Sequence, residues 1–316
     1  MECVVAKVLS LLLLPVWLGL CSCAPSSSSQ LSTASKRAET KSTKYPVVLQ
    51  HGFLGFDKIL FFDYFYGVPG KLRDEGYKVY TPKVAAINGI AVRAHELAGQ
   101  IDQILQETGA AKVNIIGHSM GGLDARYLVS TLGYGDRVAS ISSIATPHHG
   151  TYLADAVLAV IGLHNPLEEA MATMMGVSSD ATTVGNPKYR NFGSIDLREN
   201  MYNLSTGYMN EHFNPENPDD DRVFYQSWSG EVSFQDMVNP DWLSEILRVT
   251  HDYLALREGP SDGIVSVQSA RHGQDNGTFK AHHLDEIGQL FGHQAYNFSY
   301  QQFYSDMIAD LAKRGL

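Results

Sequence analysis

The sequence predicts an α/β fold in which a mostly parallel central sheet is covered by helices on both faces. Short apolar, β-branched runs alternate along the chain with longer segments in which apolar residues recur at helical spacing. The runs are nearly continuous in their apolar character, as expected of strands buried on both faces. Loops rich in Gly and His follow three of these runs, which places them at the carboxyl edge of the sheet, where α/β proteins carry their sites.

The elements can be assigned in order from Tyr45, where the folded domain is expected to begin. The expected strands are Pro46–Gln50, Tyr77–Val84, Val113–Ile116, Arg137–Ala145 and Arg222–Trp228. The expected helices are Val92–Thr108, with an apolar stripe from Val92 to Leu105 and Gly109 as its stop, Leu123–Leu132 and Tyr300–Leu311. The segment 186–221 is rich in Asn, Pro and Asp and is expected to be irregular surface.

A serine motif lies at the centre of this pattern. Gly117–Gly121 reads G-x-S-x-G, directly after the Val113–Ile116 run and directly before an expected helix. Strand, sharp turn and helix is the context in which such a motif lifts a serine hydroxyl above the end of a strand. Ser119 is therefore the predicted nucleophile.

A serine nucleophile needs a base to take its proton and an acid to orient that base. His282 and His283 lie far downstream, where the order nucleophile, acid, base would place the base. Asp262 precedes a β-branched run at an expected tight turn, which suits an orienting carboxylate, and on residues alone Asp262 and His283 are favoured without excluding others. The other candidates are His51, His118, His148 and His149 for the base and Asp241 and Asp252 for the acid.

Composition limits the class of partner. The chain has 316 residues, 44% hydrophobic and 18% charged, which suits one large globular domain. Its formal net charge of -10 gives no electrostatic attraction to nucleic acid or to an anionic membrane. No nucleic-acid partner is expected, and any contact with lipid must be apolar.

The N-terminal segment has the pattern of an export signal. Residues 1–24 contain an apolar run that is short for a membrane span, and they are expected to be a signal peptide. Leu20–Cys23 resembles a bacterial lipobox with Cys23 as the lipidated residue, and a plain cleaved signal is the alternative. Residues 25–44 are Ser-rich and are expected to form a tether to the domain at 45–316. A secreted protein, anchored through Cys23 in the lipobox case, is therefore expected.

A strongly apolar stretch is expected to act as a lid. Residues 151–180 carry many Leu, Val and Met residues in short helical pieces interrupted by Gly162, Pro166 and Gly176. A mobile helical lid with its apolar face over the site is one interpretation. An ordinary pair of core helices is the other.

Four motifs stand in order along the chain: HGFLG at 51–55, GHSMGG at 117–122, SDGIV at 261–265 and HLDEIGQ at 283–289. In these motifs and their spacing the chain resembles the bacterial triacylglycerol lipases typified by Pseudomonas and Burkholderia enzymes. The resemblance runs from about Pro46 to the C-terminal helix and is weakest between Tyr152 and Tyr225. It implies an α/β-hydrolase fold with a helical lid, and catalytic Ser119, Asp262 and His283. It further implies an oxyanion hole formed by the backbone N–H groups of Phe53 and Met120.

The same resemblance implies a structural calcium ion. The implied ligands are Asn239, Asp285, Gln289 and His293, the last two through their backbone carbonyls. Asn239 stands where the family has an Asp, so the site has one negative charge fewer and is expected to bind calcium more weakly. Many family members also carry a disulfide and need a lipase-specific foldase as a partner. All three cysteines of this chain lie in the expected signal segment, at Cys3, Cys21 and Cys23.

The expected function is hydrolysis of carboxylic esters of lipids at an oil–water interface by a Ser-His-Asp acyl-enzyme mechanism. An esterase or acyltransferase acting on shorter or soluble acyl esters is the first alternative. A non-catalytic hydrolase fold that binds lipid is the second.

Overall fold

The structure is a computed structural model that describes residues 42–53, 58–59, 62–159, 196–232, 242–289, 292, 295 and 297–316, with only the backbone at 58–59, 62–63 and 242–247. The expected signal segment and residues 25–41 of the expected tether lie outside these residues, as do residues 160–180 of the expected lid. Within the described part of the chain, no helix has the length and apolar character needed to cross a membrane.

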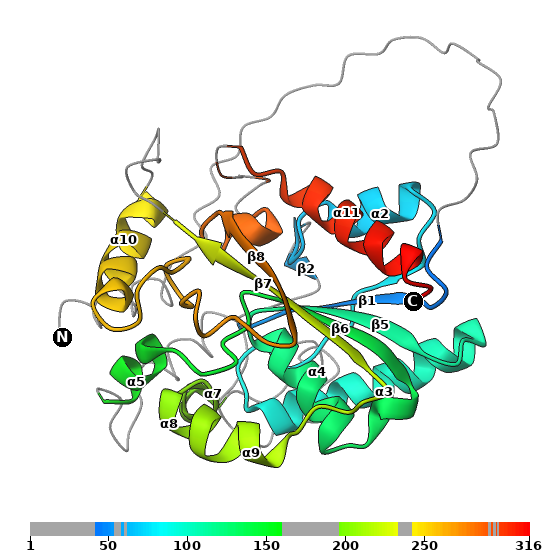
Figure 1. The fold of residues 1–316 in the computed structure, drawn as a ribbon, viewed down its shortest axis with the longest axis horizontal. Coiled ribbons are helices and arrows are strands. Elements are labelled where there is room, and N and C mark those ends of the chain that lie inside the picture. The colour runs from blue at the N-terminus through cyan, green and yellow to red at the C-terminus, as the bar shows by residue number, and fades with distance from the viewer. Residues whose placement is uncertain are drawn as a thin grey trace, which may run out of the picture.

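A six-stranded sheet forms the centre of the molecule (Figure 1), in the order β4-β1-β5-β6-β7-β8. Every neighbouring pair is parallel, as the sequence predicts. A separate two-stranded antiparallel ribbon joins β2 and β3. The strands are β1 (Val47–Gln50), β2 (Lys58–Ile59), β3 (Phe62–Asp63), β4 (Val79–Tyr80), β5 (Val113–His118), β6 (Val138–Ile144), β7 (Phe224–Glu231) and β8 (Gln274–Lys280).

Helices follow and connect these strands. The longer ones are α2 (Val68–Asp74), α3 (Ile90–Thr108), α4 (Met120–Ser130), α5 (Tyr152–Leu158), α7 (Leu197–Asn203), α10 (Trp242–Ala255) and α11 (Tyr300–Lys313). The short ones are the 3-10 turns Tyr134–Asp136 and Asp285–Ile287, α8 (Thr206–Tyr208), the π-helix Met209–Phe213 and α9 (Asn214–Glu216).

The two faces of the sheet are covered by different helices. Successive side chains of a strand point to opposite faces. Val47 and Leu49 of β1 accordingly pack with α2 and α11. Val48, between them, packs with α3 and α4 on the opposite face. In Figure 1, α2 and α11 lie above the sheet and α3 and α4 below it. The predicted double covering is confirmed.

The segment 196–217 corrects the sequence prediction of irregular surface. It forms α7, α8, the π-helix and α9, and its apolar side chains are buried. One of the Asp residues that indicated irregular structure is a helix cap, because Asp196 accepts the N–H of Glu199. Ser205 caps the next helix by accepting the N–H of Tyr208. The buried apolar residues Leu197, Met201, Leu204, Met209 and Phe213 pack in one cluster with the start of α4.

Two smaller differences concern element ends and one strand. Helix α4 begins at Met120, three residues before the expected start, because Gly121 and Gly122 are part of the helix. A side chain at Gly122 would collide with Thr146, so the glycine serves close packing rather than a break. Strand β8 has no counterpart among the expected strands, because it is a mostly exposed edge strand without an apolar run.

Candidate active site

Ser119 lies in the turn between β5 and α4. Its backbone has φ 55° and ψ -132°, a conformation that residues other than glycine rarely adopt. The N–H of Ser119 donates to the carbonyl of Ile144 on β6 at 2.9 Å, which fixes the turn to the sheet. Gly52 lies directly against this turn, because a Cβ there would be 2.7 Å from the Cβ of Ser119. The loop after β1 therefore passes immediately beside the serine.

Asp262 and His283 form a buried pair. His283 Nδ1 and Asp262 Oδ2 are 2.6 Å apart, and the N–H of His283 donates to the carbonyl of Asp262 at 3.1 Å. The other carboxylate oxygen, Oδ1, accepts the backbone N–H groups of Ile264 and Val265 at 2.8 and 2.7 Å. The tight turn predicted from the sequence thus holds the carboxylate from one side and leaves Oδ2 for the imidazole.

The alternative acids have other positions. Asp252 lies on α10, where its carboxylate contacts His251 at 3.4 Å. Asp241 lies outside the described residues.

The alternative bases also have other partners. His282 Nε2 lies 3.1 Å from Asp285 Oδ2, and the ring of His148 stacks on that of His272. His149 Nδ1 is 2.9 Å from Asn210 Oδ1. Of the neighbouring pair His282 and His283, it is His283 that meets Asp262.

The two predicted oxyanion donors lie on the two segments that border Ser119. Met120 is fully buried and is the first residue of α4, so its N–H belongs to the first helical turn, which has no partner within the helix. Phe53 follows Gly52 and packs against the same apolar cluster as Met120. The two segments are in close contact, because a Cβ on Gly121 would be 2.9 Å from the carbonyl oxygen of His51.

The family model described as the alpha/beta hydrolase fold matches residues 45–301. The chain belongs to the α/β-hydrolase family. This α/β-hydrolase is similar to a triacylglycerol lipase of Vibrio cholerae, at 32% identity over 79% of this chain and 81% of the relative. A triacylglycerol lipase of Burkholderia plantarii is 30% identical over 83% and 84% of the two chains. The lipase resemblance inferred from the sequence is confirmed.

Solved structures show the same fold. A mature lipase of Bacillus licheniformis superposes with a TM-score of 0.61 at 19% identity, over 85% of this chain and 93% of that one. A metagenomic carboxyl esterase superposes with a TM-score of 0.64 at 17% identity, over 94% and 82%. The α/β-hydrolase fold is therefore confirmed, and family and relatives together identify a carboxylic-ester hydrolase.

The structure of the hydrolase adds two buried residues to those predicted from the sequence, Tyr64 and Glu286, and places the candidate base His118 between them. Tyr64 Oη and His118 Nδ1 are 2.8 Å apart, and His118 Nε2 and Glu286 Oε2 are 3.0 Å apart. The ring of His118 lies beside that of His283, with centroids 4.5 Å apart. Glu286 Oε2 also lies 4.0 Å from Nδ1 of His283. This chain of polar groups surrounds the Asp262–His283 pair.

Burial shifts the protonation of these groups. Burial first, and the charge of Asp262 second, raise the pKa of Glu286 well above its usual range. Burial, together with the neighbouring His283, holds the pKa of His118 well below its usual range. Both shifts favour the neutral form of a group that cannot be solvated. The only sequence signal for Glu286 was its place three residues after His283, which is uninformative by itself.

The four predicted calcium ligands are described only in part. Asn239 and His293 lie outside the described residues. Asp285 is buried, and its Oδ2 is 3.1 Å from Nε2 of His282. Gln289 donates its side-chain amide to the carbonyl of Tyr64 at 2.7 Å, which leaves its backbone carbonyl, the predicted ligand atom, uninvolved in that bond. The donor types suit calcium, and His282 would compete for the Asp285 carboxylate.

The expected lid is described only at its start. Helix α5 covers Tyr152–Leu158, capped by the Thr151 side chain, and buries Leu153, Ala154, Ala156 and Val157. The remainder of the expected lid, from 160, lies outside the described residues. This first part of the segment packs as an ordinary core helix, against the same cluster as Met120.

Proposed function

We propose that this hydrolase is a triacylglycerol lipase that works through an acyl-enzyme on Ser119. The observation that carries the proposal is the buried Asp262–His283 pair at 2.6 Å, whose imidazole lies against His118, the residue before a serine held in a strained turn. Relatives named triacylglycerol lipase support the substrate class. The same site would also serve an esterase or acyltransferase, so substrate class needs its own test.

The tautomer of His283 follows from its partner. A carboxylate oxygen only accepts, so Nδ1 of His283 carries the proton that it donates to Asp262 Oδ2. Nε2 is then the basic nitrogen, and it takes the proton of the Ser119 hydroxyl as Oγ attacks the ester carbonyl. The resulting imidazolium gives that proton to the leaving alcohol as the C–O bond breaks. Water then repeats the sequence on the acyl-enzyme, releasing the fatty acid and restoring the serine.

The negative charge that forms on the carbonyl oxygen is stabilised by the N–H groups of Phe53 and Met120. Such donors act on charge that exists only in the transition state, so they accelerate the reaction when they are fixed in advance.

A chain-length series tests the substrate class. Release of fatty acid from emulsified long-chain triacylglycerol should exceed hydrolysis of short p-nitrophenyl esters, and it should rise sharply once the substrate forms a separate phase. Smooth saturation through the solubility limit, with a preference for short esters, would instead favour the esterase. Products formed in the presence of an acceptor alcohol separate hydrolysis from acyl transfer.

Labelling with a fluorophosphonate separates an enzyme from a lipid-binding protein. The wild-type chain should be labelled, and the Ser119→Ala variant should not. A wild-type chain that bound lipid without being labelled would favour the non-catalytic alternative.

We further propose export, with residues 1–24 as the signal peptide and a lipid on Cys23. The apolar run and the Leu20–Cys23 sequence support this. Mass spectrometry of the mature N-terminus in a bacterial host should find an acylated Cys23, and Cys23→Ser should release the protein from the membrane fraction. A mature protein beginning elsewhere would indicate a plain cleaved signal. Dependence on a foldase is tested by co-expression with and without one.

We also propose a structural calcium ion held by Asn239, Asp285, Gln289 and His293. When bound, the ion would brace the loop that carries His283 and take no part in the chemistry. Excess chelator should lower the melting temperature, and added calcium should restore it. Asn239→Asp should tighten binding through its extra charge. Absence of calcium binding at millimolar concentration in isothermal titration would rule out the site.

A further inference from the structure

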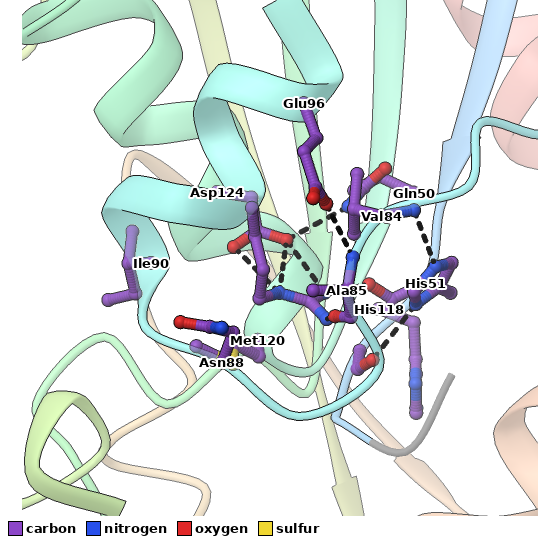
Figure 2. A network of polar contacts seen from close by, with 12 residues as sticks. Gln50, His51, Val84, Ala85, Asn88, Ile90, Glu96, His118, Met120 and Asp124 are labelled. Carbon is purple, nitrogen blue, oxygen red and sulfur yellow. Dashed lines mark hydrogen bonds and ion pairs between the residues drawn. The ribbon is translucent and has the colours of Figure 1, made fainter. Parts of the chain in front are cut away.

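A fully buried ion pair between α3 and α4 contacts the two residues that precede Gly52. Figure 2 shows its carboxylate, Asp124, with Gln50 and His51 nearby. Arg93 on α3 and Asp124 on α4 have no solvent exposure, and Arg93 Nη2 lies 2.8 Å from Asp124 Oδ2. Arg93 Nε lies 3.1 and 3.0 Å from the two oxygens of the same carboxylate. The guanidinium therefore meets the carboxylate along one edge and keeps other N–H groups for further acceptors.

The remaining N–H groups of Arg93 donate to backbone carbonyls in two loops, the one after β1 and the one after β4. Arg93 Nη2 donates to the carbonyl of His51 at 2.7 Å, and Nη1 donates to the carbonyl of Ala85. On the other side of the pair, Asp124 Oδ2 accepts the side-chain amide of Gln50 at 2.9 Å. Gln50 and His51 are the two residues that lead into Gly52 and Phe53. The ion pair thus connects helix α4 with the segment that carries the first oxyanion donor.

The imidazole of His51 connects this network to the peptide group between Gly52 and Phe53. Its Nε2 lies 3.3 Å from the N–H of Val84 and accepts from it. A neutral imidazole that accepts at Nε2 donates at Nδ1, and Nδ1 of His51 lies 3.0 Å from the carbonyl oxygen of Gly52. The carbonyl of Gly52 and the N–H of Phe53 belong to the same peptide group. Because a trans peptide is planar, fixing this carbonyl also fixes the direction of the Phe53 N–H.

The preceding peptide group is fixed at both ends. Its carbonyl, on His51, accepts from Arg93, and its N–H, on Gly52, bonds to the hydroxyl of Tyr64. Asp124 lies four residues after Met120 on the same helix. Its position relative to the Met120 N–H, the second oxyanion donor, is therefore fixed by the helix backbone. One buried pair therefore sets the relative placement of the two N–H groups.

We propose that the Arg93–Asp124 pair is a positioning device for the oxyanion hole, holding the Phe53 N–H in fixed geometry relative to the Met120 N–H. The role rests on the proposed function, because it requires an oxyanion at this place. A buried ion pair is a weak source of stability compared with apolar side chains of similar size. Its fork of donors, however, fixes carbonyls that an apolar side chain would leave free. Arg93 and Asp124 touch no substrate and act through the peptide groups that do.

The test is the Arg93→Lys variant, which keeps the charge and loses the fork. Its kcat on a soluble p-nitrophenyl ester should fall roughly 10- to 100-fold with little change in KM. This is less than the roughly 100- to 1000-fold that follows removal of an oxyanion donor. Affinity for a transition-state analogue, such as a trifluoromethyl ketone, should fall in proportion to kcat/KM. A purely structural role would lower the melting temperature and leave the active fraction with normal kcat and normal analogue affinity.

The matched control is Arg137→Lys, since Arg137 pairs with Asp102 of the same helix α3 at 2.8 Å but on the exposed surface. It should leave kcat, KM and analogue affinity unchanged. If Arg93→Lys does not fold, Asp124→Asn decides the matter, because it keeps the size of the side chain while removing the charge and replacing one of the two acceptor oxygens by a donor. It should show the same loss on a smaller scale.

Two failures are distinguishable. A folded wild-type chain that neither hydrolyses the ester nor reacts with a fluorophosphonate overturns the proposed function, and the positioning role with it. An active wild type with unchanged kcat and analogue affinity in folded Arg93→Lys or Asp124→Asn overturns the positioning role alone.

Discussion

Two buried polar networks border Ser119, and they differ in how they handle charge. On the base side, Tyr64, His118 and Glu286 surround the Asp262–His283 pair. Burial favours the neutral forms of His118 and Glu286 there, and Glu286 Oε1 has no hydrogen-bond partner among the described residues. On the oxyanion side, Arg93 and Asp124 form a close ion pair whose donors also bind backbone carbonyls.

This difference in charge corresponds to the different chemical requirements of the base side and the oxyanion side. The base side must gain and lose a proton at His283 in each half-reaction, so neighbouring groups that are neutral add no fixed charge beside Asp262. The oxyanion side must keep the same geometry throughout, and a permanently paired Arg and Asp provide it. Tyr64 joins the two sides, because its hydroxyl meets both His118 and the backbone of Gly52.

The largest effect on turnover is expected from removing the Ser119 hydroxyl, which lies between the two networks. Ser119→Ala removes the covalent route and should reduce turnover about a million-fold, as in other serine hydrolases. The melting temperature should not fall, because the variant loses only the hydroxyl and the turn keeps its backbone hydrogen bonds. Ester hydrolysis measured with purified variant tests this, and retained turnover would mean that another residue attacks.

Removing the charge on the base side should have the next largest effect. In Asp262→Asn the amide oxygen can still accept the N–H groups of Ile264 and Val265. The side chain no longer selects the tautomer of His283, however. A loss of about 10⁴-fold in kcat is expected, by analogy with the same change in another serine hydrolase. Asp252→Asn on α10 is the control and should be near wild type. The reverse outcome would show that the acid has been assigned wrongly.

The sequence was informative where chemistry dictates a local pattern. Ser119 could be predicted from its strand–turn–helix context, and Asp262 from a turn that ends in a β-branched run. Pairing of Asp262 with His283 rather than His282 could not be derived from the residues, because the two histidines are adjacent and only the path of the loop after β8 decides between them. On residues alone His283 was favoured without excluding the other histidines, and the family resemblance then implied it.

The supporting networks could not be predicted, because they depend on which face of a helix is buried. Val92 belonged to the expected apolar stripe of α3, yet its side chain is 41% exposed while that of Arg93 is fully buried. A charged residue in an amphipathic helix normally indicates the solvent face. Here Asp124, distant in sequence, compensates the buried charge, and one sequence does not reveal that pairing.

Removing the Tyr64 hydroxyl, which links the two networks, should lower activity less than a change within either network. Tyr64→Phe removes a hydroxyl that serves both His118 and Gly52, at a cost of about 1–3 kcal/mol for buried groups left without partners. We expect a lower melting temperature and a several-fold lower kcat, since both the base and the oxyanion loop lose a contact. Thermal unfolding and ester kinetics measure the two effects. Tyr66→Phe, two residues away, is the control. A loss of kcat in that variant as well would argue against a specific link.

The smallest effect on activity, and the sharpest difference between the networks, should appear in the pH dependence of stability. The pKa of Glu286 is raised in the folded state by burial and by Asp262, whereas in the unfolded chain it returns to its ordinary value. Between these two pKa values the native state binds more protons than the unfolded state, so stability falls as pH rises. Glu286→Gln removes the titrating group and should remove that slope. Burial also raises the pKa of Asp124, but the charge of Arg93 and the hydrogen bonds from Arg93 and Gln50 oppose that rise, so the Arg93–Asp124 network should contribute a smaller slope.

The measurement compares melting temperatures of wild type and Glu286→Gln from about pH 4.5 upward at constant ionic strength. The difference, variant minus wild type, should grow as pH rises through the raised pKa of Glu286. His118 is present in both proteins, and its lowered pKa contributes stability that rises with pH, a slope of the opposite sign to that of Glu286. Parallel curves over the whole range would mean that Glu286 titrates alike in the folded and unfolded chains. The base side would then hold a second ionised carboxylate, and the contrast between the two networks would be wrong.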